Sequence, residues 1–267
     1  MTEDARLGKM NPVIARNEEA KPVKRVLARR TKSNCILTGP GGVGKTAIVE
    51  LISQKITDGD VPNILKNARL FALDLALLNA GAKYKGDFEE RLKGVIKEVE
   101  ENSKEGHLIV LFIDEIHMLM GSGSNDAQNA ANILKPALSR QAIKVIGATT
   151  DNEYRAIFEK DAAAARRFQV IHVDEPSIKE TLAILRGLKD KYEIHHGVRI
   201  LDSGIVSCAT MAKRYLPYRL LPDSAIDLLD IASAKVAIDR DSKPEELDNL
   251  ESCLLYTSDA ADELDGV

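Results

Sequence analysis

The sequence predicts an α/β protein: a parallel five-stranded sheet flanked by helices and followed by a small helical subdomain. Two observations support this prediction. Between residues 35 and 168, short apolar runs alternate with amphipathic stretches, which is typical of a parallel sheet covered by helices. After Pro176, the apolar residues repeat at helical spacing instead. The sheet and the helical subdomain are therefore expected one after the other along the chain.

Five apolar runs are expected to form the strands. In chain order they are Cys35 to Thr38, Leu70 to Leu73, Leu108 to Ile113, Ile143 to Ala148 and Phe168 to Val173. The third run is apolar at every position, and such continuous character indicates a strand buried on both faces. We therefore expect this strand in a central position of the sheet.

The helical subdomain is expected to begin at Ser177. Ser177 and Glu180 have the spacing of a capping box, in which each side chain bonds the backbone N–H of the other residue. A further helix is expected to start near Asp223, and the polar run from Asp239 to Pro244 ends it.

The expected division of the chain has three parts. A large subdomain covers residues 1–175, the small helical subdomain covers 176–241, and a last segment covers 242–267. This last segment is expected to begin another helix, but from Ser252 onward it continues no periodic pattern. We expect that end to be foreign to the natural protein.

Composition and charge narrow the class of protein. With 44% hydrophobic residues among 267, the chain can bury a substantial core. A net charge of −4 and 4% aromatic residues supply neither the basic surface nor the stacking platform that nucleic acids require. No apolar run approaches the roughly 20 residues that span a bilayer, and three widely separated cysteines suit reduced thiols. We expect a cytoplasmic protein, with the nucleus as a further location, that binds neither nucleic acid nor membrane.

The most specific motif is a phosphate-binding loop. It matches G-x-x-x-x-G-K-[ST] between a predicted strand and a predicted helix, with the residues Gly39, Pro40, Gly41, Gly42, Val43, Gly44, Lys45 and Thr46. Glycines let backbone N–H groups surround phosphate oxygens, and the helix N-terminus adds partial positive charge. Lys45 would reach the β and γ phosphates, and the Thr46 hydroxyl would bind Mg²⁺. The sequence thus predicts ATP and Mg²⁺ as cofactors.

Two acidic residues follow the third predicted strand. Asp114 and Glu115 emerge at the carboxyl edge of the sheet, where open α/β sheets bind ligands. Asp114 is suited to hold Mg²⁺, and Glu115 to polarise the water that attacks the γ phosphate. The sequence therefore predicts hydrolysis as well as binding.

Three further residues have two interpretations each. Thr150, after the fourth predicted strand, could orient the γ phosphate or cap the next helix through Glu153, and the two roles are compatible. Arg166 and Arg167 could favour the dipole of a preceding helix, or act as an arginine finger on the ATP of a neighbouring subunit. The two arginines alone do not decide between these roles.

Several segments together resemble one family. They are residues 11–14, 39–46, 81–91, 112–117, 147–150 and 191–199, and the match covers most of residues 7–251. They are similar to the first ATPase domain of the ClpB and heat-shock-100 protein disaggregases, which are AAA+ P-loop NTPases. The fungal cytosolic members show the greatest resemblance.

The resemblance implies a function and further site residues. In that family, a homo-hexameric ring uses ATP hydrolysis to thread aggregated or unfolded polypeptides through a central pore, with the help of co-chaperones. The matching positions imply that Val13 and Ile14 flank the adenine and that Thr150 senses the γ phosphate. They also imply that Arg166 and Arg167 act across the subunit interface.

The resemblance also implies a pore loop at Lys83, Tyr84 and Lys85, in which the tyrosine grips the substrate. An aromatic ring offers a large, rigid contact area at low entropic cost. The neighbouring Gly86 would let the loop move with the nucleotide state.

Other classes of protein share some of these motifs. A Clp unfoldase that feeds a peptidase has nearly the same ATPase motifs. A nucleotide-dependent binding switch with little turnover is favoured by Ala164-Ala165, where the family carries a bulky apolar residue and a glutamate. A DNA helicase or clamp-loading ATPase fits the acidic balance poorly. A metal enzyme is disfavoured because His195-His196 lacks a third ligand at workable spacing, and His117 is interpreted as structural.

Overall fold

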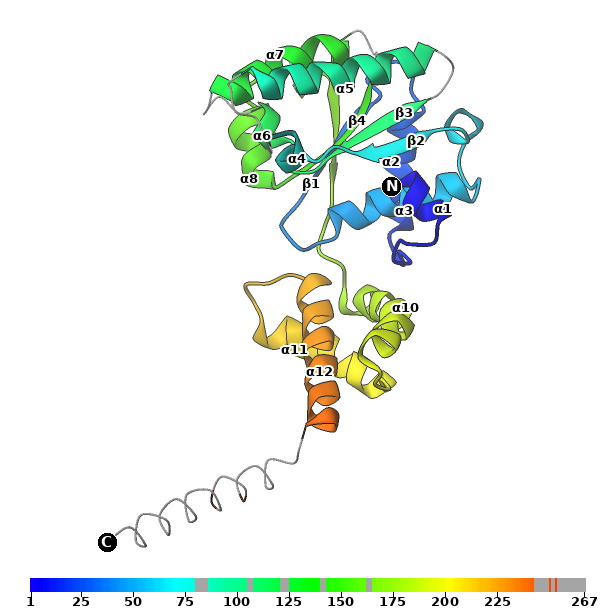
Figure 1. Ribbon diagram of the computed structural model, residues 1–267, viewed down its shortest axis with the longest axis vertical. Helices are drawn as coiled ribbons and strands as arrows, with labels where there is room; N and C mark the ends of the chain where they lie inside the picture. The colour runs from blue at the N-terminus through cyan, green and yellow to red at the C-terminus, as the bar shows by residue number, and fades with distance from the viewer. Residues whose placement is uncertain are drawn as a thin grey trace, which may run out of the picture.

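The computed structural model has an α/β part and, below it in Figure 1, a helical part that we call the lid (residues 177–242). The structure describes residues 1–79, 86–104, 108–120, 125–139, 143–161 and 165–242, together with Leu250 and Cys253. The predicted order, a sheet followed by a helical subdomain, is confirmed.

The sheet has five strands, all parallel. They are β1 (Asn34–Thr38), β2 (Arg69–Ala72), β3 (Ile109–Ile113), β4 (Lys144–Thr149) and β5 (Phe168–His172). Their order across the sheet is β2-β3-β4-β1-β5. This confirms the predicted fold, and each strand bound lies within one residue of its expected place. The internal strand β3 is buried at every position, as its continuous apolar run predicts.

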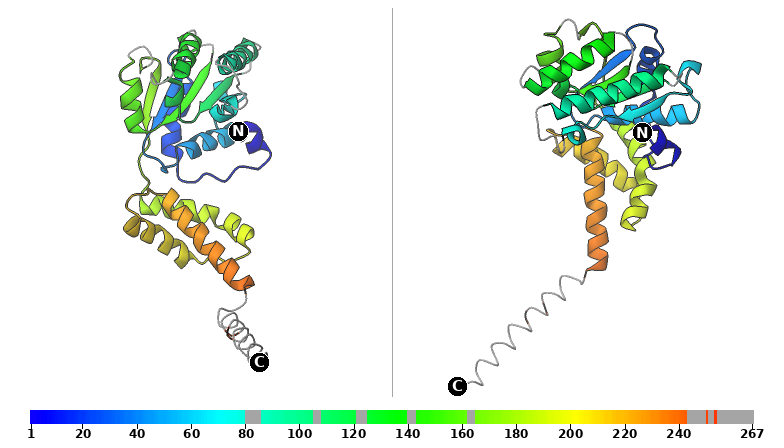
Figure 2. Two further views of the ribbon diagram at one scale, coloured as in Figure 1. Left: turned by 60° about the vertical axis from the view of Figure 1, so that its left-hand side comes forward. Right: turned by 45° about the horizontal axis from the view of Figure 1, so that its top comes forward.

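Helices cover both faces of the sheet, and the further views in Figure 2 show the same layers. One face carries α1 (Thr2–Arg6), α2 (Asn17–Leu27) and α3 (Lys45–Thr57), and the other carries α5 (Asp87–Lys104) and α7 (Asn125–Ser139). Along β1, Cys35 and Leu37 belong to the core under α2 and α3, whereas Ile36 belongs to the core under α5 and α7. Successive strand residues point to opposite faces, so each face has its own apolar core.

Short elements fill the connections between strands and long helices. They are η1 (Asn63–Leu65), α4 (Leu75–Asn79), α6 (His117–Met120), α8 (Asp151–Glu153) and the π-helical turn η2 (Tyr154–Phe158). Since α6 follows β3 and α8 follows β4, both begin at the carboxyl edge of the sheet.

The lid contains α10 (Ile178–His196), α11 (Asp202–Tyr215) and α12 (Asp223–Asp241), which share an apolar core. The predicted capping box is confirmed: Glu180 N donates to Ser177 Oγ (3.3 Å) and Ser177 N donates to Glu180 Oε2 (2.8 Å). The helix expected near Asp223 starts at that residue. The division of the chain at residues 175 and 241 stays a prediction.

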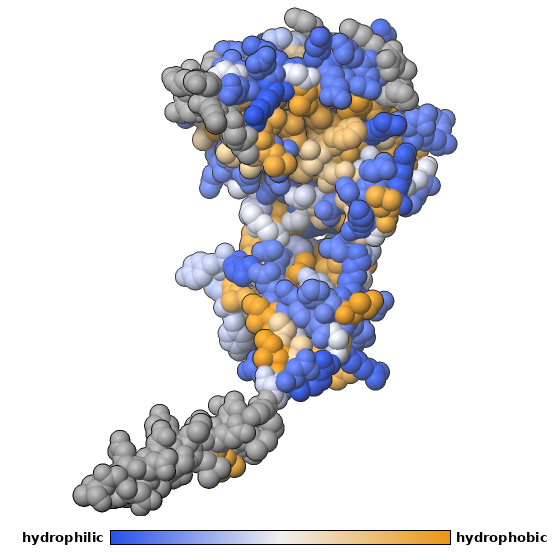
Figure 3. All heavy atoms as spheres, viewed as in Figure 1, coloured by the Kyte–Doolittle hydropathy of each residue, from blue (hydrophilic) through white to orange (hydrophobic). Residues whose placement is uncertain are grey.

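The helices, the cysteines and the exposed apolar residues give further information about the surface and the interior. No described helix combines the length and the apolar character needed to cross a membrane. Cys35 and Cys208 are buried, and burial raises the pKa of the Cys35 thiol to about 12, which makes it unreactive. Figure 3 shows apolar surface on both parts of the molecule. On α12, the exposed apolar side chains are Ile231, Val236 and Ile238.

Ser177→Ala is expected to lower the free energy of unfolding of the lid by about 1 kcal/mol, because it removes the side chain that caps α10. Urea unfolding followed by circular dichroism measures the loss. Ser203→Ala is the control, since Ser203 is an exposed residue of α11 that does not cap the helix. Equal losses in the two variants would contradict a stabilising role of the cap.

Candidate nucleotide site

The phosphate-binding loop joins the end of β1 to the start of α3. Gly42 and Gly44 have φ values of 80° and 91°, in the left-handed region that glycine adopts without strain. The loop leads directly into the N-terminus of α3, whose free N–H groups and dipole favour an anion. The loop therefore has the conformation and the helix that phosphate binding needs.

Lys45 is the first residue of α3 and lies against its own loop. Its ammonium donates hydrogen bonds to Gly39 O (2.9 Å) and Pro40 O (2.8 Å). Burial lowers the pKa of Lys45, and the negative charges of Asp114 and Glu115 oppose that shift. A phosphate beside the ammonium would favour its charged form further.

Thr46 and Asp114 come together from different elements. Thr46 Oγ1 donates to Asp114 Oδ2 (3.2 Å), although 68 residues separate them in the sequence. Hydroxyl and carboxylate oxygens are ligands that Mg²⁺ accepts, with water and phosphate oxygens completing its coordination. These two side chains fit the predicted cation.

A pocket of about 380 Å³ lies between the phosphate-binding loop and the lid, and a pocket of this size suits a small molecule. Its apolar lining includes Val13, Ile14, Ile184, Leu188 and Ile226. Its polar lining includes Lys45, Thr46, Asp114 and Glu115. The pocket thus offers apolar surface to a flat ring and charged groups to phosphates.

Ile14 lies directly against the lid helix α10. A Cβ atom on Gly187 would lie 1.6 Å from Ile14 Cδ1, so only glycine permits this approach. One turn further along α10, Lys191 Nζ donates to Met10 O (2.8 Å) and Asn11 Oδ1 (3.0 Å). These contacts hold the N-terminal segment against the lid.

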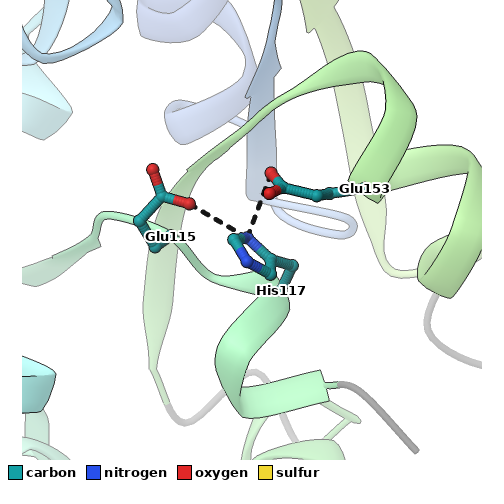
Figure 4. Close-up of side chains that lie close together, drawn as sticks. All are labelled: Glu115, His117 and Glu153. Atoms are coloured by element: carbon teal, nitrogen blue, oxygen red, sulfur yellow. Dashed lines mark ion pairs between the residues drawn. The ribbon is translucent and has the colours of Figure 1, made fainter. Parts of the chain in front are cut away.

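The Glu115 carboxylate turns toward His117, as Figure 4 shows. Glu115 has a φ of 49°, an uncommon conformation for a residue with a Cβ atom. His117 Nδ1 lies 3.1 Å from Glu115 Oε2 and 3.3 Å from Glu153 Oε2. From sequence, His117 is expected to be structural and Glu153 only a cap partner, so their place beside Glu115 is new information.

Two hydroxyl groups at the end of β4 bind Glu153. Thr150 Oγ1 donates to Glu153 Oε2 (2.7 Å) and accepts from Glu153 N (3.3 Å), which confirms its predicted role as the cap of α8. The buried Thr149 hydroxyl donates to the same oxygen (3.0 Å). Burial opposes the charge of Glu153, but the hydrogen bonds from Thr150 and Thr149 outweigh it and lower the pKa of the carboxyl. The γ-phosphate role of Thr150 stays a prediction.

Arg166 and Arg167 precede β5 and therefore lie at the amino edge of the sheet. The phosphate-binding loop lies at the carboxyl edge, since it follows β1, which pairs in parallel with β5. A strand of this length spans about 16 Å. An arginine finger at these positions would therefore act on the ATP of another copy of the chain.

Two charged residues at the site belong to no sequence motif. Arg16 is buried, donates to Val43 O in the phosphate-binding loop, and pairs with Glu19 Oε1 (2.6 Å). Asp223, the first residue of α12, lines the pocket beside Gly42. The sequence predicts Asp223 only as the start of a helix, not as a residue of the site. No motif or periodic pattern in the sequence points to Arg16.

The predicted pore-loop residues lie outside the described part of the chain. They are Lys83, Tyr84 and Lys85. Ala164, which distinguishes the run before the paired arginines, lies outside it as well.

Matches to known families agree with this geometry. The AAA model, an ATPase family associated with various cellular activities, matches residues 35–174, and the AAA lid domain model matches residues 177–265. The chain belongs to the AAA family of ATPases. Within this family it is closely related to the ClpB, Hsp98 and Hsp104 chaperones, as the following comparisons show.

Heat shock protein hsp98 of Neurospora crassa is 56% identical over 253 residues, which cover 94% of this chain and 27% of the relative. Chaperone protein ClpB of Brucella suis is 54% identical over 252 residues, which cover 94% of this chain and 28% of the relative. The chain therefore spans less than a third of the length of these relatives.

Two solved structures of Hsp104 also match. The S. cerevisiae Hsp104–ADP complex has a TM-score of 0.85 at 66% sequence identity, and the match covers 96% of this chain and 35% of that one. A closed state of Hsp104 with ATPγS and FITC casein has a TM-score of 0.83 at 67% identity, and the match covers 90% of this chain and 41% of that one. These matches confirm the resemblance inferred from the motifs, fungal members included.

Gly187→Ala is expected to weaken nucleotide binding about tenfold, because the added methyl group displaces Ile14 from the pocket. Overpacking of this kind costs about 1–3 kcal/mol, and about 1.4 kcal/mol corresponds to a factor of ten. Titration with a fluorescent ADP analogue measures the dissociation constant. Gly204→Ala in α11 is the matched control, since a Cβ atom there meets nothing within 4 Å. Equal affinities in the two variants would show that Ile14 does not support the nucleotide.

Proposed function

We propose that this chain binds ATP with Mg²⁺ and hydrolyses it, as the first ATPase domain of a ClpB-type protein disaggregase. The observation that best supports the proposal is the contact of Thr46 with Asp114 beside Lys45, because it brings cation ligands and an ammonium group together. The similar Hsp104 structures contain ATPγS or ADP, which supports the same class of cofactor here.

Each residue of the site has a task in this proposal. Lys45 exchanges the carbonyl groups of its loop for the β and γ phosphates. Thr46 and Asp114 would hold Mg²⁺, which would supply positive charge beside the phosphates. Val13 and Ile14, which line the pocket, flank the adenine.

The chemistry at the γ phosphate depends on Glu115 and Thr150. Glu115 orients the attacking water and accepts its proton, so that the water oxygen can bond to phosphorus as the ADP oxygen leaves. Thr150 would have to release Glu153 before its hydroxyl could bind the γ phosphate, since the two side chains are bonded to each other.

A hexameric ring completes the site in this proposal. Arg166 and Arg167 stabilise the transition state of a neighbouring copy, which is consistent with their place at the opposite edge of the sheet from their own phosphate-binding loop. Apolar side chains exposed on α12, such as Ile231 and Ile238, are available to subunit contacts.

Polypeptide threading is the proposed role of the whole protein, of which this chain is one part. Tyr84, between Lys83 and Lys85, would grip an unfolded or aggregated substrate in the pore. Casein is present in the similar Hsp104 structure with ATPγS and in a further one, an S. cerevisiae Hsp104–casein complex in an extended conformation, which supports a polypeptide substrate. Co-chaperones and a cytoplasmic location, with the nucleus in addition, belong to the same proposal.

Lys45→Ala is expected to abolish ATP binding, because it removes the ammonium that contacts the phosphates. Glu115→Gln is expected to keep binding and to lower the hydrolysis rate by about 10²–10⁴, the usual contribution of a general base. Calorimetric titration and a phosphate-release assay measure the two effects. Retained turnover in the Glu115→Gln chain would overturn the assigned mechanism.

Mixing two inactive variants tests the arginine finger. Arg167→Ala lacks the arginine but keeps the phosphate-binding loop, and Lys45→Ala lacks the loop lysine but keeps both arginines. Each variant is expected to be inactive alone, because every interface then lacks one of the two groups. A mixture is expected to regain hydrolysis, because mixed interfaces join an intact loop to an intact arginine. The assay is run over a range of protein concentrations, with co-assembly verified by sedimentation. No recovery in co-assembled mixtures would exclude action between subunits.

A further inference from the structure

His117 Nδ1 lies among three oxygen atoms that come from three places in the chain. The distances are 3.1 Å to Glu115 Oε2, 3.2 Å to Thr149 Oγ1 and 3.3 Å to Glu153 Oε2. Figure 4 shows the ring between the two glutamates. The His117 side chain is only 19% exposed, so neighbouring groups hold the ring in place.

These neighbours determine where the proton of the imidazole ring resides. An unprotonated Nδ1 would direct its lone pair at two carboxylates, which is unfavourable, so we assign the proton to Nδ1. One possible metal-ligand atom from each of Glu115, His117 and Glu153 lies within 4.8 Å of the others. That spacing would admit a cation, but the hydrogen bonds among these side chains already satisfy them.

Glu153 is already bonded on the side that faces this proton. Its Oε2 accepts hydrogen bonds from Thr149 Oγ1 (3.0 Å), Thr150 N (3.0 Å) and Thr150 Oγ1 (2.7 Å). Glu115, by contrast, is 53% exposed, and in the described part of the chain His117 is the ion-pair partner of its carboxylate. Glu153 Oε2 therefore has its hydrogen-bond donors without the Nδ1 proton, and Glu115 is the carboxylate that needs this donor.

We infer that His117 is a positioning residue for Glu115. Its Nδ1–H fixes one carboxylate oxygen of Glu115 and leaves the other oxygen free for the attacking water. Thr149 Oγ1 and Glu153 Oε2 lie 3.2 and 3.3 Å from the same nitrogen and confine the ring, and the capping box of α8 anchors Glu153 at the end of β4. This inference rests on the proposed function, in which Glu115 activates water.

The first test compares His117→Ala with His117→Asn. Asparagine carries an N–H donor at nearly the position of Nδ1, whereas alanine carries none. His117→Ala is expected to lower kcat about tenfold to a hundredfold, the loss expected from a misplaced catalytic group, with the KM for ATP unchanged. His117→Asn is expected to recover most of the rate. Equal rates in wild type and His117→Ala, or an asparagine variant as slow as the alanine one, would overturn the inference.

His196→Ala is the matched control. His196 also pairs with a carboxylate through one ring nitrogen, at 2.7 Å from Asp230 Oδ1, and its side chain is only 11% exposed. It lies in the lid, away from Glu115, so kcat is expected to stay within about twofold of wild type. A loss equal to that of His117→Ala would show a general effect of removing a buried imidazole and contradict the inference.

A double variant tests whether His117 acts through Glu115. If it does, adding His117→Ala to Glu115→Gln lowers the residual rate no further, because the group that it positions is already disabled. A further tenfold loss would show an independent role and overturn the inference.

A spectroscopic measurement separates this inference from the proposed function, because it needs no turnover. Nitrogen-15 NMR of the full chain at a pH where the ring is neutral reports which ring nitrogen carries the proton, and His117→Asn identifies the signal. A proton on Nδ1 that responds to Glu115→Ala supports the inference even in a chain without ATPase activity. The absence of ATPase activity would then contradict the proposed function but not the position of the proton. A proton on Nε2 would overturn the inference whatever the ATPase activity.

Discussion

The parallel pairing of β1, β4 and β3 is the constraint on which the site depends. Parallel strands bring their carboxyl ends to one edge, and neighbouring strands lie about 4.8 Å apart. With β4 between them, the ends of β1 and β3 are therefore about 10 Å apart. The phosphate-binding loop after β1 carries Thr46 across this distance, and its hydroxyl meets Asp114, which follows β3, at 3.2 Å. The apolar cores on the two faces of the sheet hold the strands in this order. Packing away from the pocket therefore sets the distance between Thr46 and Asp114.

The pocket belongs to the α/β part and to the lid together, and this has a mechanical consequence. Ile14 contacts α10 at Gly187, while Asp223 of α12 lies beside Gly42. A nucleotide in the pocket would touch both parts, and it would favour whichever lid orientation gives it the better contacts. In the proposed function, nucleotide binding and lid orientation are therefore coupled through these two contacts.

The sequence predicted the local features of this protein and one contact between distant segments, that of Thr46 with Asp114, because both residues belong to recognisable motifs. It missed the contacts of residues that belong to no motif. The internal strand β3 was visible because a strand buried on both faces is apolar throughout, and the capping box at Ser177 was visible because it spans a single helical turn. The bond from Arg16 to the carbonyl of Val43 has no such signature, since buried charge is unusual and the contact depends on tertiary packing. The place of His117 beside Glu153 is also set by the sheet order, which no periodic pattern encodes.

The strand directions also divide the chemistry between copies of the chain. In the proposed function, the phosphate-binding loop and Asp114 follow β1 and β3, and His117 and Glu153 follow β3 and β4, so one chain supplies all of them at its carboxyl edge. Arg166 and Arg167 precede β5 at the other edge, where a parallel strand holds them away from their own phosphate-binding loop. In that proposal, nucleotide binding needs one chain, whereas full stabilisation of the transition state needs a neighbouring copy. Hydrolysis is then expected to be slow until copies of the chain assemble, because the arginines of one copy act at the loop of another.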